Sequence, residues 1–197
     1  MAIMSIEELT KPLFAISDDL ERSEKELLAN DNLYSRRNYI RALIAAIELS
    51  VFVLKQTLLV AEPSCPGKLT FAELALLREE TFDLENTGKV RTQKKFLKIA
   101  DNLRFTIRCV EKGFGLSLNF NPGDRNWNDF KKTMEIRNRI THPKGHKDFD
   151  VSRQEAELAV RVGHWFAEFL KDWFHQFIAT VKPVYESAAA KEPDYTT

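Results

Sequence analysis

The sequence predicts an all-α protein, a mostly antiparallel bundle of about five to six helices. Of its 197 residues, 44% are hydrophobic and 29% charged, whereas only seven are Gly and seven are Pro. This composition favours helices over many short strands. Apolar residues recur at spacings of three and four along most of the chain, as on the buried face of a helix. At three of the predicted helix starts, Ser or Thr is followed three residues later by Glu, the pattern of a capping box.

The first predicted helix opens with the capping box Ser5/Glu8 and runs to about Asn30, with a solvated acidic face. The second, from about Ser35 to Ala61, is the most apolar stretch of the chain. Its length invites a transmembrane interpretation, but Glu48 at its middle would be costly in hydrocarbon. We therefore expect a core helix and no membrane association.

The second capping box, Thr70/Glu73, opens a predicted helix from Phe71 to about Asn86. Thr87 and Gly88 end this helix. A basic run then leads into a fourth helix that ends near Lys112 and carries Phe96, Ile99, Leu103, Ile107 and Val110 at helical spacing. Gly113 to Asp124 has no helical period, so we expect a functional loop or a short extended excursion. No stretch predicts a strand convincingly.

A fifth helix is expected from about Asp124 to His142, with Trp127, Phe130 and Met134 on its inner side. The last helix begins at the capping box Ser152/Glu155 and ends near Val181, ahead of Pro183. Its aromatic stripe has the spacing of a buried face, so it predicts core or a dimer interface rather than base stacking. The domain prediction is one helical domain over 1–181 and a mobile tail over 182–197.

Charge and cysteine content limit the class of protein. Lys plus Arg and Asp plus Glu both total 29, so nucleic-acid binding would have to be local. The run from Lys89 to Lys98 contains no acid and is either an RNA track or a solvated helix face. Cys65 and Cys109 suit neither a disulfide framework nor a metal site. The N-terminus carries acidic residues where a signal peptide has basic ones, so it predicts a cytoplasmic protein.

The candidate site is the segment Arg137 to His142, directly before Pro143. Proline ends the helix there, which leaves the imidazole of His142 on a solvated last turn. Arg137 lies one and a half turns inside the helix and carries a charged fork that can hold a phosphate. An imidazole that exchanges protons near neutral pH, placed near a guanidinium that can bind phosphate, predicts phosphodiester chemistry. The alternative is structural: Arg137 caps carbonyls or pairs with a carboxylate, and His142 finishes the helix.

The stretch from Trp127 to Lys144 resembles the signature of the HEPN superfamily, and the second helix is similar to the apolar core helix of that family. The resemblance implies a metal-independent endoribonuclease of toxin–antitoxin or phage-defence systems. It places Arg137 and His142 as the catalytic pair and Asn138 as the polar residue beside them. It also implies a homodimer in which two such pairs face one cleft.

The mechanism that the resemblance implies is attack of an RNA 2′-hydroxyl on the adjacent phosphate, which leaves a cyclic phosphate and a free 5′-hydroxyl. His142 would act as general acid or base, and Arg137 would stabilise charge on the transition state. No cofactor is expected. The expected partners are RNA, a second copy of the chain and a cognate antitoxin or regulatory protein. The alternative function is a non-catalytic helical module that binds nucleotide or protein.

Several neighbouring residues complete the predicted site. Arg139, Lys144 and Lys147 are candidate RNA contacts, with solvated basic side chains as the default. Glu48, a carboxylate in an apolar helix, needs a partner. It would pair with Arg137 or orient His142, or else pair with another arginine such as Arg41 or Arg108. His146 follows His142 by four residues, but the intervening Pro143 and Gly145 argue against zinc, so no metal is expected.

Overall fold

The computed structural model describes residues 6–62 and 67–189. Within these ranges the chain is mostly helical with one small two-stranded sheet, which confirms the predicted all-α class. The elements in chain order are α1 (Ile6–Ala29), α2 (Leu33–Ala61), α3 (Phe71–Leu77), β1 (Glu80–Leu84), β2 (Val90–Lys94), α4 (Ile99–Phe114), α5 (Arg125–Thr141), the 3-10 helix η2 (His146–Phe149) and α6 (Arg153–Ala189).

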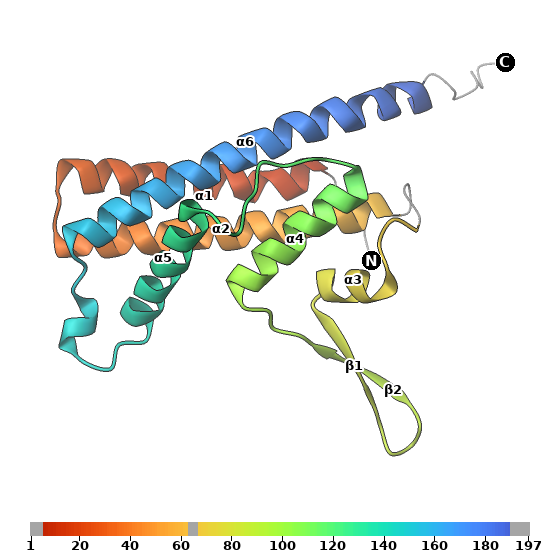
Figure 1. Cartoon of the computed structure of the whole chain (residues 1–197), viewed down its shortest axis with the longest axis horizontal. Coiled ribbons are helices and arrows are strands. Elements are labelled where there is room, and N and C mark those ends of the chain that lie inside the picture. The colour runs from red at the N-terminus through yellow and green to blue at the C-terminus, as the bar shows by residue number, and fades with distance from the viewer. Residues whose placement is uncertain (1–5, 63–66, 190–197) are drawn as a thin grey trace.

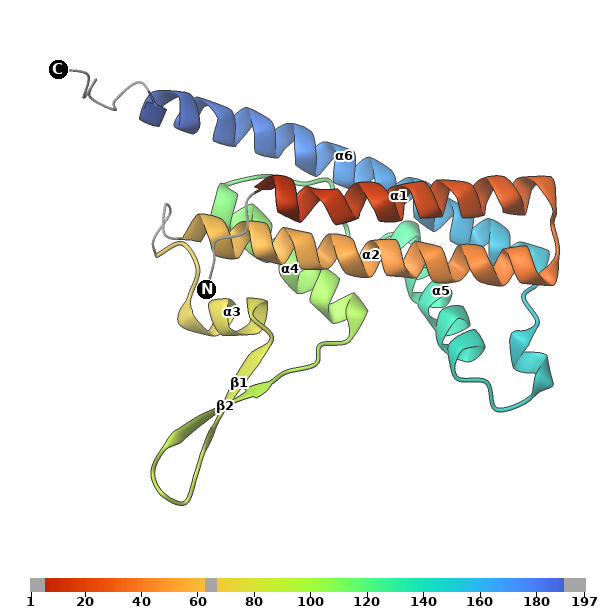
Figure 2. The same cartoon turned by 180° about the vertical axis from the view of Figure 1, so that it is seen from behind.

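Helix α2 is the centre of the bundle. α1 packs antiparallel along it, α6 lies on the same side, and α4 and α5 pack on its other side and diverge from each other (Figures 1 and 2). Its residues Tyr39, Ile40, Leu43 and Ile47 have no exposed surface. Among the described helices, α2 alone has the length and hydropathy of a membrane span, and more than half of that window is buried inside the bundle. Burial on most sides explains the nearly continuous apolar sequence.

The region after α3 differs from the prediction of one helix over Phe71 to Asn86 and of no strand. α3 ends at Leu77, and β1 and β2 form an antiparallel hairpin in which Glu80 lies opposite Lys94 and Leu84 opposite Val90. Apolar and polar residues alternate from residue 81 to 84, the period of a strand rather than of a helix. Gly88, with φ of +78°, makes the hairpin turn instead of ending a helix. We call residues 80–94 the hairpin arm.

The arm also changes the prediction for the fourth helix. α4 begins at Ile99, so Phe96 precedes it and is 86% exposed rather than part of its apolar face. Ile99, Leu103, Ile107 and Val110 do face the core, as predicted. The helix ends in the left-handed conformation at Gly115, the usual place for glycine at a helix end.

The structure confirms two of the predicted capping boxes but not the predicted end of the last helix. Thr70/Glu73 and Ser152/Glu155 make the reciprocal hydrogen bonds of a capping box, which confirms both helix starts. The first predicted box includes Ser5, which lies outside the described residues. α6 continues past Pro183 to Ala189, so its predicted end near Val181 is wrong: a proline removes one backbone hydrogen bond without necessarily ending a helix. Residues 190–197 of the predicted tail lie outside the described residues.

An ion pair between a buried lysine and a half-exposed glutamate joins the arm to the bundle. Lys55 of α2 is only 2% exposed, and its Nζ lies 2.9 Å from Oε1 of Glu79, the residue before β1. Glu79 has φ of +57°, an unfavourable left-handed conformation for a residue with a Cβ. Its carbonyl oxygen accepts a hydrogen bond from the backbone N–H of Lys95 at 2.6 Å. Glu79 therefore turns the chain, closes the base of the arm and neutralises a buried ammonium.

We predict that Glu79→Ala lowers the free energy of unfolding by about 1–3 kcal/mol, because the Lys55 ammonium loses its partner. Glu79→Gly loses the same ion pair but relieves the left-handed backbone, so it should be about 1 kcal/mol more stable than the alanine variant. Urea unfolding followed by circular dichroism measures both. The exposed Glu168→Ala is the control, and identical stability of the two Glu79 variants would contradict the assigned strain.

The buried Cys109 tests whether the core around it is closed to solvent. Desolvation raises the pKa of its thiol to about 11, so the reactive thiolate is scarce at pH 8. In a Cys65→Ser background, we expect a thiol-specific reagent to label Cys109 only as fast as the protein opens. Adding denaturant should give complete labelling within seconds. Rapid labelling of the native protein, measured by mass spectrometry, would show that this part of the core is accessible.

Candidate functional site

The site lies at the C-terminal end of α5. The carboxylate of Asp124 caps the helix start by accepting the backbone N–H of Trp127 at 2.8 Å. Trp127, Phe130 and Met134 are buried against the core, which confirms the predicted inner stripe. The helix ends at His142, whose backbone N–H donates to the carbonyl of Asn138 at 2.9 Å. The placement of His142 at the helix end, before Pro143, is therefore as predicted.

Arg137 projects from α5 toward α2 and is held there by two acceptors. Its Nη2 donates to Oε1 of Glu48 at 2.5 Å, and its Nη1 donates to Oδ1 of Asn138 at 3.1 Å. The Arg137 side chain is 25% exposed and that of Glu48 is 46% exposed. Glu48 thus lies on the open side of α2 rather than inside its apolar surroundings. Since a guanidinium has five N–H donors, this arrangement orients Arg137 and leaves donors for another anion.

His142 is exposed, and among the described residues none is hydrogen-bonded to its imidazole. A step of five residues along an α-helix is a rise of about 7.5 Å and a rotation of about 140° beyond one full turn. Arg137 and His142 therefore leave α5 in different directions. Within one chain, the two functional groups approach from different sides of the helix end.

The predicted RNA contacts have different surroundings. Arg139 points to α6, where it donates to Oε1 of Glu155 at 2.7 Å and to the carbonyl of Asp150 at 2.8 Å. These contacts tie α5 to the first turn of α6. Lys144 and Lys147 are exposed on the segment that follows His142. The structure thus brings Arg137, Asn138 and Glu48 together, while Arg139 has a structural role and both lysines face solvent.

Arginines at the start of α2 hold the segment around His142, a role that the sequence analysis did not predict. Arg41 donates to the carbonyl of Ile140 at 3.1 Å, in the last turn of α5. Arg36 donates to the carbonyl of Val151 at 3.0 Å, and Arg37 to that of Phe149 at 2.9 Å. Cations suit a helix C-terminus because its carbonyls carry partial negative charge. The sequence feature that could have predicted this role was a cluster of arginines at the start of an otherwise apolar helix.

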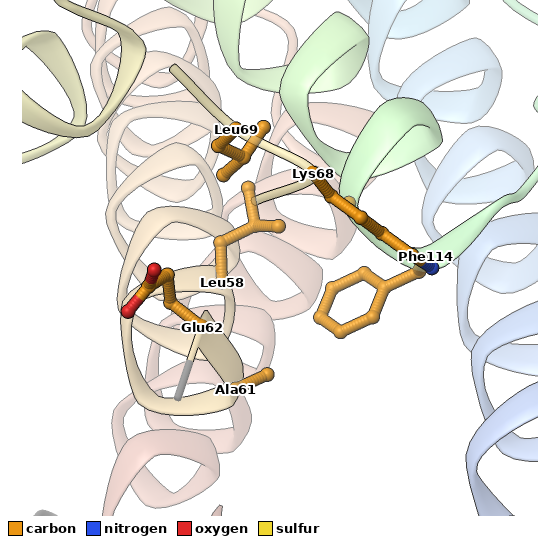
Figure 3. A pocket seen from close by; sticks show the side chains of 7 residues that line it. Leu58, Ala61, Glu62, Lys68, Leu69 and Phe114 are labelled. Atoms are coloured by element: carbon orange, nitrogen blue, oxygen red, sulfur yellow. The ribbon is translucent and has the colours of Figure 1, made fainter. Parts of the chain in front are cut away.

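Side chains that bind metal ions do not gather in this described region. Among the described residues, no group of three or more His, Cys, Asp or Glu side chains is placed to hold a metal ion. His146 lies in η2 and is exposed. A small pocket of about 10 Å³ lies elsewhere, where α2 ends near Phe114 of α4 (Figure 3). It has room for about one water molecule, so we assign it no ligand.

Comparisons of the chain with protein-family models, with curated proteins and with solved structures find no match. The resemblance of residues 127–144 to the HEPN signature therefore stays a hypothesis that rests on the sequence.

We predict that Arg41→Met loosens the last turn of α5, because the Ile140 carbonyl loses a charged donor. A cation at a helix C-terminus contributes about 0.3–1 kcal/mol, so amide hydrogen exchange at His142 should become roughly two- to fivefold faster. Arg22→Met, on the exposed side of α1, is the matched control. Unchanged exchange at His142 in the Arg41 variant would show that the carbonyl contact does not hold the helix end.

Proposed function

We propose that the protein is a metal-independent endoribonuclease of HEPN type that acts as a cytoplasmic homodimer in a toxin–antitoxin or phage-defence setting. One observation carries the proposal: Arg137 is held at the surface by Glu48 and Asn138, and the solvated His142 follows at the end of the same helix. This arrangement places an oriented guanidinium that can bind phosphate and an imidazole that can transfer protons in one region.

The proposed reaction is transesterification within RNA. The 2′-oxygen forms a bond to the adjacent phosphorus, the bond from phosphorus to the 5′-oxygen breaks, and a cyclic phosphate and a 5′-hydroxyl result. His142 takes the proton of the 2′-hydroxyl or supplies one to the leaving 5′-oxygen, and water makes the other proton transfer, so that the proton lost by the 2′-oxygen is balanced by the one gained by the 5′-oxygen. Arg137 donates hydrogen bonds to phosphate oxygens whose charge increases in the transition state. Lys144 and Lys147, exposed beyond His142, would contact neighbouring phosphates.

A second copy of the chain fits this geometry, because Arg137 and His142 diverge around α5 within one copy. The open side of α2 next to Arg137 carries the exposed residues Ala45, Glu48 and Phe52. A small residue and an exposed phenylalanine suit contact with another helix. A twofold dimer on this side would place Arg137 of one copy near His142 of the other.

The ion pairs of the site favour a second candidate, a non-catalytic module that binds nucleotide or protein. Arg137 already has a carboxylate partner in Glu48, and Arg139 has one in Glu155. Ion pairs of this kind also occur as purely structural contacts. Tight binding of a nucleotide or protein partner by wild-type protein that cleaves no RNA at any concentration would support this candidate.

Cleavage of a labelled RNA in EDTA tests the proposal. We expect the wild type to cleave, with a cyclic phosphate at the new 3′ end, and Arg137→Ala and His142→Ala each to lose roughly a hundredfold or more in rate. Lys171→Ala, on the exposed side of α6, should keep the wild-type rate. Equal cleavage by all variants would refute the assignment of this site, and loss of cleavage in EDTA would refute metal independence.

Mixing the two inactive variants tests whether the site is shared. In a mixed dimer, the intact Arg137 of one copy would meet the intact His142 of the other, so part of the activity should return. No recovery in a preparation shown to contain mixed dimers would place the pair within a single chain.

A further inference from the structure

Five exposed cations follow one another along the chain from the tip of the hairpin arm to the start of α4. We call this set the basic strip: Lys89, Arg91, Lys94, Lys95 and Lys98. Residues 89–98 contain no acid, and within the described part of the chain none of the five has an ion-pair partner within 4.0 Å. Acids of β1 lie across the ladder, with Glu80 opposite Lys94 and Asp83 opposite Arg91. Lys95 and Lys98 follow β2 and have no partner residue in this ladder.

An exposed aromatic ring lies within the basic strip. Phe96 is 86% exposed, and it lies between Lys95 and Lys98 in a segment that is neither helix nor strand. An exposed aromatic pair also lies at the arm, where the rings of Phe71 of α3 and Phe82 of β1 stack with centroids 5.5 Å apart. Lysines around exposed aromatic rings are typical of surfaces that bind single-stranded nucleic acid.

The strip leads toward the candidate site. The arm and the C-terminal end of α5 project from the same side of α2, with α4 between them (Figures 1 and 2). The chain that follows β2 runs back from the arm to the first residue of α4, at the end of α4 that lies nearer α5. Lys95 and Lys98 lie on this connecting segment and therefore on the part of the strip that approaches α5.

We infer that the basic strip is a track for single-stranded RNA, in which the lysines contact phosphates, Phe96 stacks on a base and the strand continues toward the end of α5. This inference rests on the proposed ribonuclease function and adds where the substrate outside the cleavage site is held. A polyanion is the occupant because its charge complements all five cations. The strip acts on affinity and has no part in the chemical step.

Binding is measured with the full chain carrying His142→Ala, so that cleavage does not interfere. Fluorescence anisotropy of a labelled single-stranded RNA of twenty nucleotides gives the affinity at several salt concentrations. Lys95→Gln/Lys98→Gln should reduce the salt slope of log K by about 1.4, since each phosphate contact on a single strand contributes about 0.7. Phe96→Ser should weaken binding roughly tenfold with an unchanged slope, because the lost contact is stacking.

The matched control is Lys25→Gln/Lys171→Gln, which removes two exposed cations from α1 and α6. It should leave both affinity and salt slope unchanged. Wild-type affinity and salt slope in the strip variants would overturn the inference. The exposed aromatic rings at the arm would then be explained by contact with a protein partner. Circular dichroism of each variant confirms that the helical bundle is intact.

Cleavage by the enzyme with intact His142 separates this inference from the proposed function. The strip variants should lose kcat/KM on the twenty-nucleotide RNA but keep the wild-type value on a dinucleotide, which is too short to reach both α5 and the strip. Equal loss on both substrates would overturn the track. Wild-type protein that neither binds nor cleaves any RNA would overturn the proposed function itself.

Discussion

The structure depends on how the charges of α2 are paired in a bundle that buries this helix on most sides. Lys55 is buried, and an unpaired buried charge costs several kcal/mol, whereas Arg41 and Glu48 are exposed and orient their partners rather than neutralise a buried charge. Each partner comes from a different part of the chain. Arg41 binds the last turn of α5, Glu48 binds Arg137, and Lys55 binds Glu79 at the base of the arm. The charges of the central helix thus fix the parts of the protein that carry the proposed chemistry.

The pair of Glu48 and Arg137 has two opposing effects on a bound phosphate. The carboxylate fixes the direction of the guanidinium, which lowers the entropic cost of gripping an anion. It also cancels much of the positive charge that would attract one. Attraction of RNA would then depend on cations outside this pair, such as Lys144, Lys147 and the basic strip. Separate groups for attraction and for chemistry are compatible with a chain whose net charge is zero.

Long helices were predictable because their apolar period extends over many turns and their ends carry capping residues or proline. The end of α5 at His142 followed from Pro143, and the start of α6 from Ser152 and Glu155. The hairpin was missed because α3 opens with a capping box and has apolar residues at helical spacing. The alternating residues 81–84, followed by a turn at Gly88, were the overlooked sign of a hairpin.

The site was predictable only in part. The placement of Arg137, Asn138 and His142 at the end of one helix follows directly from the sequence. The pairing of Glu48 with Arg137 was one of several alternatives, because sequence does not say which arginine a distant carboxylate meets. The ion pair of Lys55 with Glu79, and the carbonyl contacts of Arg36, Arg37 and Arg41, depend on how loops return to α2. Contacts of this kind follow from tertiary packing rather than from local pattern.

The three contacts of α2 have a regular spacing, because Arg41, Glu48 and Lys55 follow one another at intervals of seven residues. Seven residues are nearly two turns, so the three side chains leave the helix in almost the same direction, about 10 Å apart along the axis. One residue inserted between Glu48 and Lys55 would rotate the arm's contact by about 100° relative to that of Arg137. An inserted heptad would instead move the arm along the axis and keep its direction. The separation of the arm from α5 is therefore set by the length of a single helix, and evolution could change it in steps of two turns.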